Sequence, residues 1–219
     1  KAIGSDQRIG SKFLSPSPGF GGSCFKKDIL NLVYLSEYFG LPEVASFWNE
    51  VVNMNIWHQH RISKLIIKKL FGTLSGKKIT ILGFAFKANT NDTRESAAIN
   101  ICKDLLEEGA HLIIHDPQVK KSQIALDLGS EEIKKFNDQD NFSNLGENLW
   151  EKMDNLNEAF INSDAVLVIT EWEEYKMIDW QKVATEMRAP AWIFDARSIV
   201  NQELVKSSGL NFWRIGDGS

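Results

Sequence analysis

Four short apolar runs limit the folds open to the second half of the chain. They cover residues 79–82, 111–115, 165–170 and 191–194, and segments with helical spacing lie between them. Buried parallel strands read as continuous apolar runs, and strands that alternate with helices form a parallel sheet with helices on both faces. The sequence therefore predicts an α/β fold with a doubly wound parallel sheet.

In such a sheet, ligands bind outside the carboxyl ends of the strands. The residues that follow the four runs are therefore candidate site residues, although ordinary polar loop residues are the alternative interpretation. A capping box at Asp92 and Glu95 is expected to begin the helix after the first run. The residues at this edge are Phe86, Lys87, Asp116, Glu171, Trp172 and Asp195 to Arg197.

The first part of the chain reads as helical. The apolar spacing after Ser23 predicts a helix from residue 24 or 25 to about residue 39, with Ser23 as its N-cap. Pro42 suits the first turn of a second, longer helix over residues 42–71. This helix carries apolar residues on more than one side, so we expect packing partners on more than one of its faces.

A loop rich in proline and glycine delivers one cysteine to the start of the first helix. Residues 15–28 read SPSPGFGGSCFKKD, and such a backbone can bring bare N–H groups against a ligand. The helix dipole at Cys24 favours a thiolate, as do Lys26 and Lys27, and Asp28 lies on the same helix face. A small, inert core cysteine behind a structural turn is the alternative.

Composition narrows the class of protein. The 219 residues are 43% hydrophobic with a net charge of −4, which suits one or two globular units. No strong basic stripe indicates nucleic acid, and no apolar run approaches the roughly 18 to 20 residues of a membrane span. The two cysteines, Cys24 and Cys102, lack metal-ligand spacing, which favours a reducing cytoplasm and no metal site. Cys102 is expected to serve packing alone.

Several motifs carry a resemblance to a known family. Residues 19–28, GFGGSCFKKD, resemble the catalytic-cysteine motif of the UDP-glucose 6-dehydrogenases, within the nucleotide-sugar dehydrogenase family. Residues 6–10 (DQRIG), 83–87 (GFAFK) and 92–96 (DTRES) resemble the same family in the same order. Many bacterial members have proline at the position of Lys26. The resemblance extends over essentially the whole chain.

The resemblance implies a domain organisation and a cofactor. Residues 1–74 would form the central helical dimerisation segment with the cysteine loop, and residues 75–219 a C-terminal, Rossmann-like UDP-binding domain. The implied enzyme is a cytoplasmic NAD-dependent dehydrogenase that forms a homodimer or a higher homo-oligomer through the long helix. The sequence contains no Gly-x-Gly-x-x-Gly motif, so we expect the N-terminal NAD-binding domain to be absent and the chain alone to be inactive.

The resemblance also implies roles for single residues. Cys24 would be the nucleophile, and Asp28 would orient or activate water. Arg94 matches an arginine that reaches NAD, and Arg197 resembles a contact to uridine diphosphate. Arg8 matches an arginine that reaches the sugar nucleotide from the neighbouring subunit. The other implied substrate contacts are Phe13, Leu14, Ser15, Pro16, Ser17, Pro18, Gly19, Phe20, Gly21, Phe86 and Lys87.

The implied reaction is the four-electron oxidation of UDP-glucose to UDP-glucuronate by two NAD, through a thiohemiacetal and a thioester on the cysteine. Two alternatives stay open. GDP-mannose 6-dehydrogenases share the Gly-Gly-Ser-Cys sequence, whereas relatives that oxidise UDP-N-acetyl sugars usually carry Gly-Gly-His-Cys without the following Lys-Asp. A dimerisation and nucleotide-sugar-binding module without catalysis is the second alternative.

Overall fold

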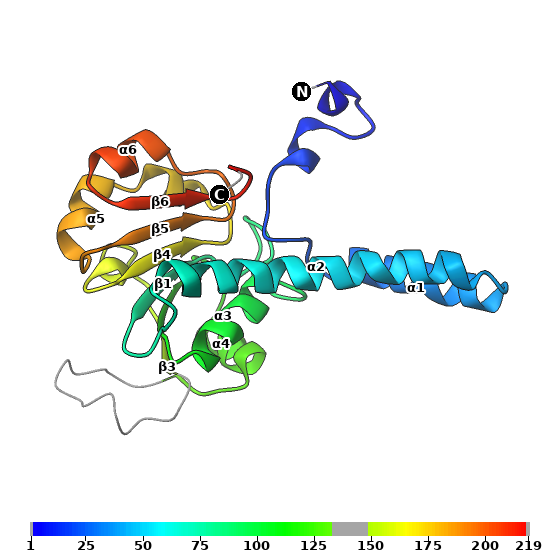
Figure 1. The fold of residues 1–219 in the computed structure, drawn as a ribbon, viewed down its shortest axis with the longest axis horizontal. Coiled ribbons are helices and arrows are strands. Elements are labelled where there is room, and N and C mark those ends of the chain that lie inside the picture. Colours follow the sequence, from blue (N-terminus) through cyan, green and yellow to red (C-terminus); the bar gives the residue numbers. More distant parts are fainter. Residues whose placement is uncertain (1, 133–148, 218–219) are drawn as a thin grey trace.

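Six parallel strands form the centre of the structure, a computed structural model that describes residues 2–132 and 149–217 (Figure 1). The strand order is β3-β2-β1-β4-β5-β6, and every neighbouring pair is parallel. The chain therefore proceeds outward from β1 in two directions, which places a topological switch point between β1 and β4. The strands are β1 (Lys78–Leu82), β2 (His111–His115), β3 (Leu149–Lys152), β4 (Ala165–Val168), β5 (Trp192–Asp195) and β6 (Asn211–Arg214).

Two hydrophobic clusters cover the two faces of the sheet. Side chains alternate between the faces along each strand, so Ile79 and Ile81 pack with α2, α3 and α4, whereas Leu82 packs with α5 and α6. The predicted doubly wound α/β fold is confirmed. The helices are α1 (Phe25–Tyr38), α2 (Pro42–Lys69), α3 (Ala97–Glu107), α4 (Lys121–Leu128), α5 (Trp180–Glu186) and α6 (Gln202–Ser207), with short 3-10 turns η1 (Ile3–Ser5), η2 (Ser11–Leu14), η4 (Glu158–Phe160) and η5 (Glu173–Met177).

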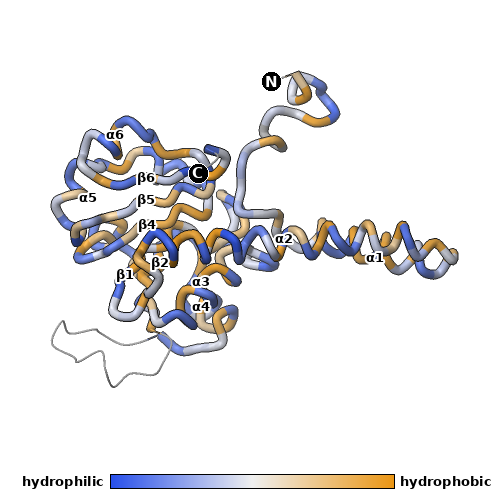
Figure 2. The backbone as a smooth tube through the Cα atoms, viewed as in Figure 1, coloured by the Kyte–Doolittle hydropathy of each residue, from blue (hydrophilic) through white to orange (hydrophobic). Residues whose placement is uncertain are grey.

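The long helix α2 has two different halves. Its C-terminal half lies on the sheet, where Ile62 and Ile66 join the core cluster. Its N-terminal half extends away from the sheet with α1 packed antiparallel beside it (Figure 1). Figure 2 shows apolar residues along this extension, where the side chains of Phe47, Met54 and Trp57 are exposed. Among the described helices, none is both long and apolar enough to cross a bilayer.

Most elements agree with the sequence, but two helix starts differ. Cys24, not Ser23, is the N-cap residue of α1, and its side chain makes no capping hydrogen bond. The expected capping box is also wrong. Glu95 has a positive φ of 54°, and the Ser96 side chain instead accepts a hydrogen bond from the Ala98 N–H. The loop before α3 therefore turns sharply, which brings Arg94 and Glu95 out toward the cysteine loop.

Candidate functional site

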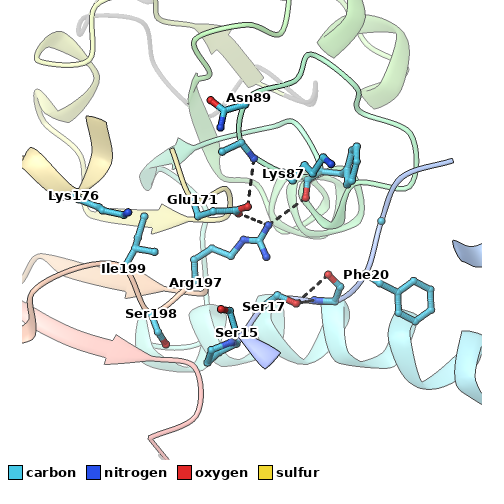
Figure 3. A pocket seen from close by; sticks show the side chains of 15 residues that line it. Ser15, Ser17, Phe20, Lys87, Asn89, Glu171, Lys176, Arg197, Ser198 and Ile199 are labelled. Carbon is cyan, nitrogen blue, oxygen red and sulfur yellow. Dashed lines mark hydrogen bonds and ion pairs between the residues drawn. The ribbon is translucent and has the colours of Figure 1, made fainter. Parts of the chain in front are cut away.

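A cavity of about 730 Å³ opens at the carboxyl ends of the strands and has two walls (Figure 3). We call one the loop wall, because it is formed by the loop that leads into α1. The other, the strand-end wall, is formed by the segments that follow β1, β4 and β5. The loop wall consists of Ser15, Pro16, Ser17, Gly19, Phe20 and Gly21. The strand-end wall consists of Phe86, Lys87, Ala88, Asn89, Glu171, Lys176, Arg197, Ser198 and Ile199.

A buried carboxylate fixes the segment after β1. Asp116, directly after β2, is 2% exposed and accepts hydrogen bonds from the backbone N–H groups of Phe84 and Ala85 at 2.7 and 3.0 Å. The Trp172 indole donates to the same carboxylate at 3.3 Å. These bonds satisfy the buried charge, and they set the course of the backbone toward Phe86.

A second buried carboxylate shapes the segment after β5. Asp195 is fully buried and accepts from the backbone N–H groups of Arg197 and Val200 at 3.0 and 2.8 Å. Burial raises the pKa of this carboxyl, whereas the backbone hydrogen bonds act in the opposite direction. The segment wraps around the carboxylate and presents Arg197, Ser198 and Ile199 to the cavity.

An ion pair lies on the strand-end wall. The Arg197 guanidinium pairs with Glu171, and its Nη2 also donates to the Phe86 carbonyl at 3.2 Å (Figure 3). Burial lowers the pKa of Arg197, and the charge of Glu171 counteracts this. With Lys87 and Lys176 also lining the cavity, cationic groups outnumber the single carboxylate of Glu171 there. The wall therefore suits an anionic ligand.

Helix α2 holds the loop wall. The Asn55 side chain accepts from the Phe20 N–H at 2.9 Å and donates to the Phe20 carbonyl at 3.1 Å. The His58 ring lies 3.3 Å from the Ser17 carbonyl. A Cβ on Gly19, whose φ is +134°, would come within 2.5 Å of the Asn55 side-chain oxygen. Glycine is therefore required for this close approach.

The loop also contacts the segment before α3. The Gly22 N–H donates to the Arg94 carbonyl at 2.8 Å, and Lys26 forms an ion pair with Glu95 at 2.8 Å. A Cβ on Gly21 would come within 2.4 Å of the Glu95 carbonyl oxygen. The cysteine loop is thus wedged between α2 and the segment after β1.

Cys24 is exposed at the start of α1, and the Ser23 hydroxyl lies 3.6 Å from its sulfur. Asp28 is also exposed, and its N–H donates to the Cys24 carbonyl at 2.9 Å. Cys102 is fully buried in the core, where burial raises the pKa of its thiol. The exposed thiol can act as a nucleophile, and the buried one serves packing, as predicted for Cys102.

The cavity brings together many of the predicted substrate contacts and leaves others outside. Ser15, Pro16, Ser17, Gly19, Phe20, Gly21, Phe86, Lys87 and Arg197 line it. Pro18 is buried beside them without lining the cavity, and Phe13 and Leu14 lie in η2. Cys24 and Asp28 follow the loop wall in sequence but do not line the cavity either.

Two predicted arginines lie on the surface. Arg8 is on the N-terminal segment that projects from the body, and Asp6 binds its guanidinium at 2.6 and 3.0 Å (Figure 1). Arg94 is held in the same way by Asp92 at 2.7 and 2.9 Å. The pKa of Arg94 is raised mainly by this hydrogen-bonded carboxylate, with a smaller contribution from Cys24. The backbone of Arg94 is also tied to the cysteine loop through the Gly22 N–H.

Sequence reasoning missed several residues of the site. Asn55 and His58 lie on a helix interpreted as a packing and dimerisation element, and nothing in their spacing indicated a loop more than thirty residues away. Glu171 was placed at this edge without a role. Lys176, Ser198 and Ile199 could have been found from their positions after predicted strands. Asn89 and Ser198 have positive φ values of 63° and 54°, which sequence alone did not indicate.

The chain resembles known proteins over nearly all of its length. UDP-glucose 6-dehydrogenase 4 of Arabidopsis thaliana is 46% identical over 225 residues, which cover 98% of this chain and 45% of that protein. UDP-glucose 6-dehydrogenase of Drosophila melanogaster is 45% identical over 225 residues, covering 99% of the chain and 44% of the relative. The chain thus spans less than half the length of these relatives.

A solved structure and two family models also match the chain. The UDP-glucose dehydrogenase from the hyperthermophilic archaeon Pyrobaculum islandicum superposes with a TM-score of 0.69 at 26% identity, over 96% of this chain and 41% of that one. A model of the family's central domain matches residues 1–57, and a model of its UDP binding domain matches residues 80–202. The chain belongs to the UDP-glucose/GDP-mannose dehydrogenase family.

Proposed function

We propose that the chain supplies the central and UDP-binding parts of an NAD-dependent UDP-glucose 6-dehydrogenase. One observation carries the proposal: the loop that forms one wall of a cationic cavity continues directly into an exposed cysteine at a helix start. Relatives that are 45 to 46% identical are named UDP-glucose 6-dehydrogenases. A ligand in the cavity would contact the cysteine loop and the strand ends at once.

The strand-end wall is the proposed seat of the nucleotide. Arg197 and Lys87 would bind the diphosphate, because guanidinium and ammonium groups form strong, charge-assisted hydrogen bonds with phosphate oxygens. The loop wall, with Ser15, Ser17 and the backbone of Gly19 and Gly21, would contact the sugar. C6 of the hexose would then lie on the side of the cavity from which the chain leads to Cys24.

Cys24 would carry the second oxidation. Its thiolate adds to the C6 aldehyde left by the first oxidation, and the resulting oxyanion takes up a proton to give a thiohemiacetal. Loss of a hydride and a proton from the thiohemiacetal gives a thioester. Water then attacks the acyl carbon, the C–S bond breaks, and the acid and the thiol are released. Asp28, one helical turn beyond Cys24, would orient or activate this water.

NAD, when bound, accepts one hydride in each of the two oxidations. Arg94 is the residue of this chain that fits a contact to it. Its side chain is 66% exposed, its guanidinium is bound by Asp92, and its carbonyl accepts a hydrogen bond from the Gly22 N–H of the cysteine loop. We propose that the remaining NAD contacts come from a glycine-rich domain that this sequence does not contain, so the 219-residue chain alone should be inactive.

The extended half of α2 supports a homodimer. Phe47, Met54 and Trp57 are each more than half exposed, and an apolar helix face of this kind is typical of an interface between copies. Arg8, which is exposed on the projecting N-terminal segment, would then reach the cavity of the neighbouring subunit.

The test is to express the reading frame that contains this chain and to count NADH formed per molecule of UDP-glucose, with GDP-mannose and UDP-N-acetylglucosamine in parallel. We expect two NADH from UDP-glucose alone. In the Cys24→Ser variant the second oxidation should fail most severely. Acid formation at the parent rate by that variant would refute the covalent role of Cys24.

The open alternatives predict other outcomes. NADH from GDP-mannose instead would keep the fold and the role of Cys24 but change the sugar. No NADH from any of the three substrates would favour a nucleotide-sugar-binding module without catalysis. NADH formation by the purified 219-residue chain would contradict its predicted inactivity.

A further inference from the structure

The ion pair between Glu171 and Arg197 connects three strand ends inside the cavity (Figure 3). Glu171 follows β4 and Arg197 follows β5. Both also bind the segment after β1, because Arg197 Nη2 donates to the Phe86 carbonyl at 3.2 Å and the Ala88 N–H donates to Glu171 Oε1 at 3.4 Å. The pair is therefore part of the construction of the strand-end wall, and not an isolated surface contact.

Arg197 depends on this partner because it is largely removed from water. Its side chain is 13% exposed, and its Nε is buried without a hydrogen-bond partner among the described residues. A buried guanidinium is costly unless a counter-charge and hydrogen bonds compensate for the lost hydration. Glu171 supplies the counter-charge, and Phe86 supplies one acceptor. These contacts hold Arg197 in place among the residues that line the cavity.

We propose that Glu171 is a positioning residue that holds the Arg197 guanidinium on the cavity wall in the orientation that binds an anionic oxygen of a nucleoside diphosphate. The proposal rests on the proposed function, since it takes uridine diphosphate as the ligand. Glu171 itself would make no contact with the phosphates. It acts on binding only through the orientation of Arg197.

A different role for the Glu171 carboxylate would change UDP affinity in the opposite direction from the positioning role. If Glu171 merely occupied the phosphate position until the ligand displaced it, removing its charge would strengthen diphosphate binding. The Ala88 N–H bond argues against this, because it ties the carboxylate to the backbone of the wall. A group held by the wall on one side and by Arg197 on the other is suited to stay in place when the ligand binds.

The test compares UDP with uridine, which lacks the phosphates, by calorimetric titration of the 219-residue chain and its Glu171→Gln variant. Glutamine keeps the size of the side chain and removes its charge. We expect UDP affinity to fall roughly tenfold while uridine affinity stays within about twofold. If Glu171 had a merely structural role, the affinities for UDP and for uridine would fall alike. Glu203→Gln, an exposed change outside the cavity, is the matched control and should leave both affinities unchanged.

A double-mutant cycle with Arg197→Lys isolates the coupling, because lysine keeps the charge but not the planar fork. In that background Glu171→Gln should have little further effect on UDP. Should Glu171→Gln fail to unfold cooperatively, Glu171→Asp replaces it, and we expect a smaller loss of the same sign. Equal or tighter UDP binding by the variant overturns this inference alone. No UDP binding by the parent chain overturns the proposed nucleotide site and, with it, this inference.

Discussion

The strand-end wall of the cavity is held from within the sheet, whereas the loop wall is held from outside it. Asp116 and Asp195, both buried, bind the backbone of the strand-end wall. The loop wall depends on Asn55 of α2 and on contacts with Arg94 and Glu95. The first wall therefore forms when the sheet folds. The second wall can loosen while the sheet stays intact.

The largest expected effect comes from disturbing the sheet directly below the strand-end wall. Gly83 has a φ of +93°, and a Cβ there would lie 2.3 Å from the Cβ of Thr170. Gly83→Ala should lower the free energy of unfolding by roughly 3 to 5 kcal/mol, since overpacking adds to backbone strain. Urea unfolding measures this. Gly209→Ala is the control, because it has a similar φ of +79° but open space around it. Equal losses in the two variants would contradict the steric argument.

The second-largest expected effect is a fall in the free energy of unfolding at acid pH. His111 in β2 is 4% exposed, and burial lowers its pKa to about 4, with Lys78 and Arg188 adding to the shift. Between pH 6.5 and 4 the unfolded chain therefore binds a proton at this residue that the folded chain does not, so stability falls as the pH falls. We expect a loss of about 2 to 3 kcal/mol between pH 7 and pH 4.5, and a smaller loss in His111→Gln. The same pH dependence in both proteins would contradict the assignment.

The Asn55→Ala variant should have a more mobile loop wall and an unchanged sheet. This change removes both hydrogen bonds to the Phe20 backbone, at 2.9 and 3.1 Å, and should cost the loop about 1 to 2 kcal/mol. Hydrogen exchange at residues 19–22 should become faster, while exchange in β1 and β4 stays the same. Asn53→Ala, on the same helix and bonded only to Glu50 in the described contacts, is the control. Equal acceleration throughout the sheet would show that the two walls are not independent.

The smallest effect is expected at the partly exposed pair between Lys26 and Glu95. Lys26→Gln should destabilise the docked loop by less than about 1 kcal/mol, and added salt should reduce the difference. The same exchange measurement applies, with Lys27→Gln as the exposed control. An effect as large as that of Asn55→Ala would mean that this pair, and not α2, holds the loop.

The sequence could predict the fold to the extent that elements carried strong apolar patterns. β1, β2, β4 and β5 were found because each is a continuous buried run. β3 and β6, at the edges of the sheet, were not predicted. Glu151, Lys152 and Arg214 interrupt their apolar character, since an edge strand has less surface to bury. Residues 127–157 were interpreted as mixed helix and loop, and 133–148 lie outside the described residues.

The residues of the site also divide into those that sequence patterns could predict and those that they could not. Phe86, Lys87 and Arg197 could be placed because residues that follow parallel strands meet at one edge. The pairing of Asn55 with Phe20 could not, because it depends on how α2 crosses the sheet. The cap of α3 was misassigned because Asp92 binds Arg94 instead of the helix end. Short-range patterns do not reveal which of two nearby donors a carboxylate will choose.

The exposed half of α2 gives the protein an optical probe of its own. The sequence has seven tryptophans, all within the described residues, and Trp57 alone among them is exposed. Its indole therefore lies in a more water-like environment than the four buried indoles of Trp150, Trp172, Trp180 and Trp213. Anything that covers this face of the helix will shift that emission to shorter wavelength and shield it from iodide, without a label or a substitution.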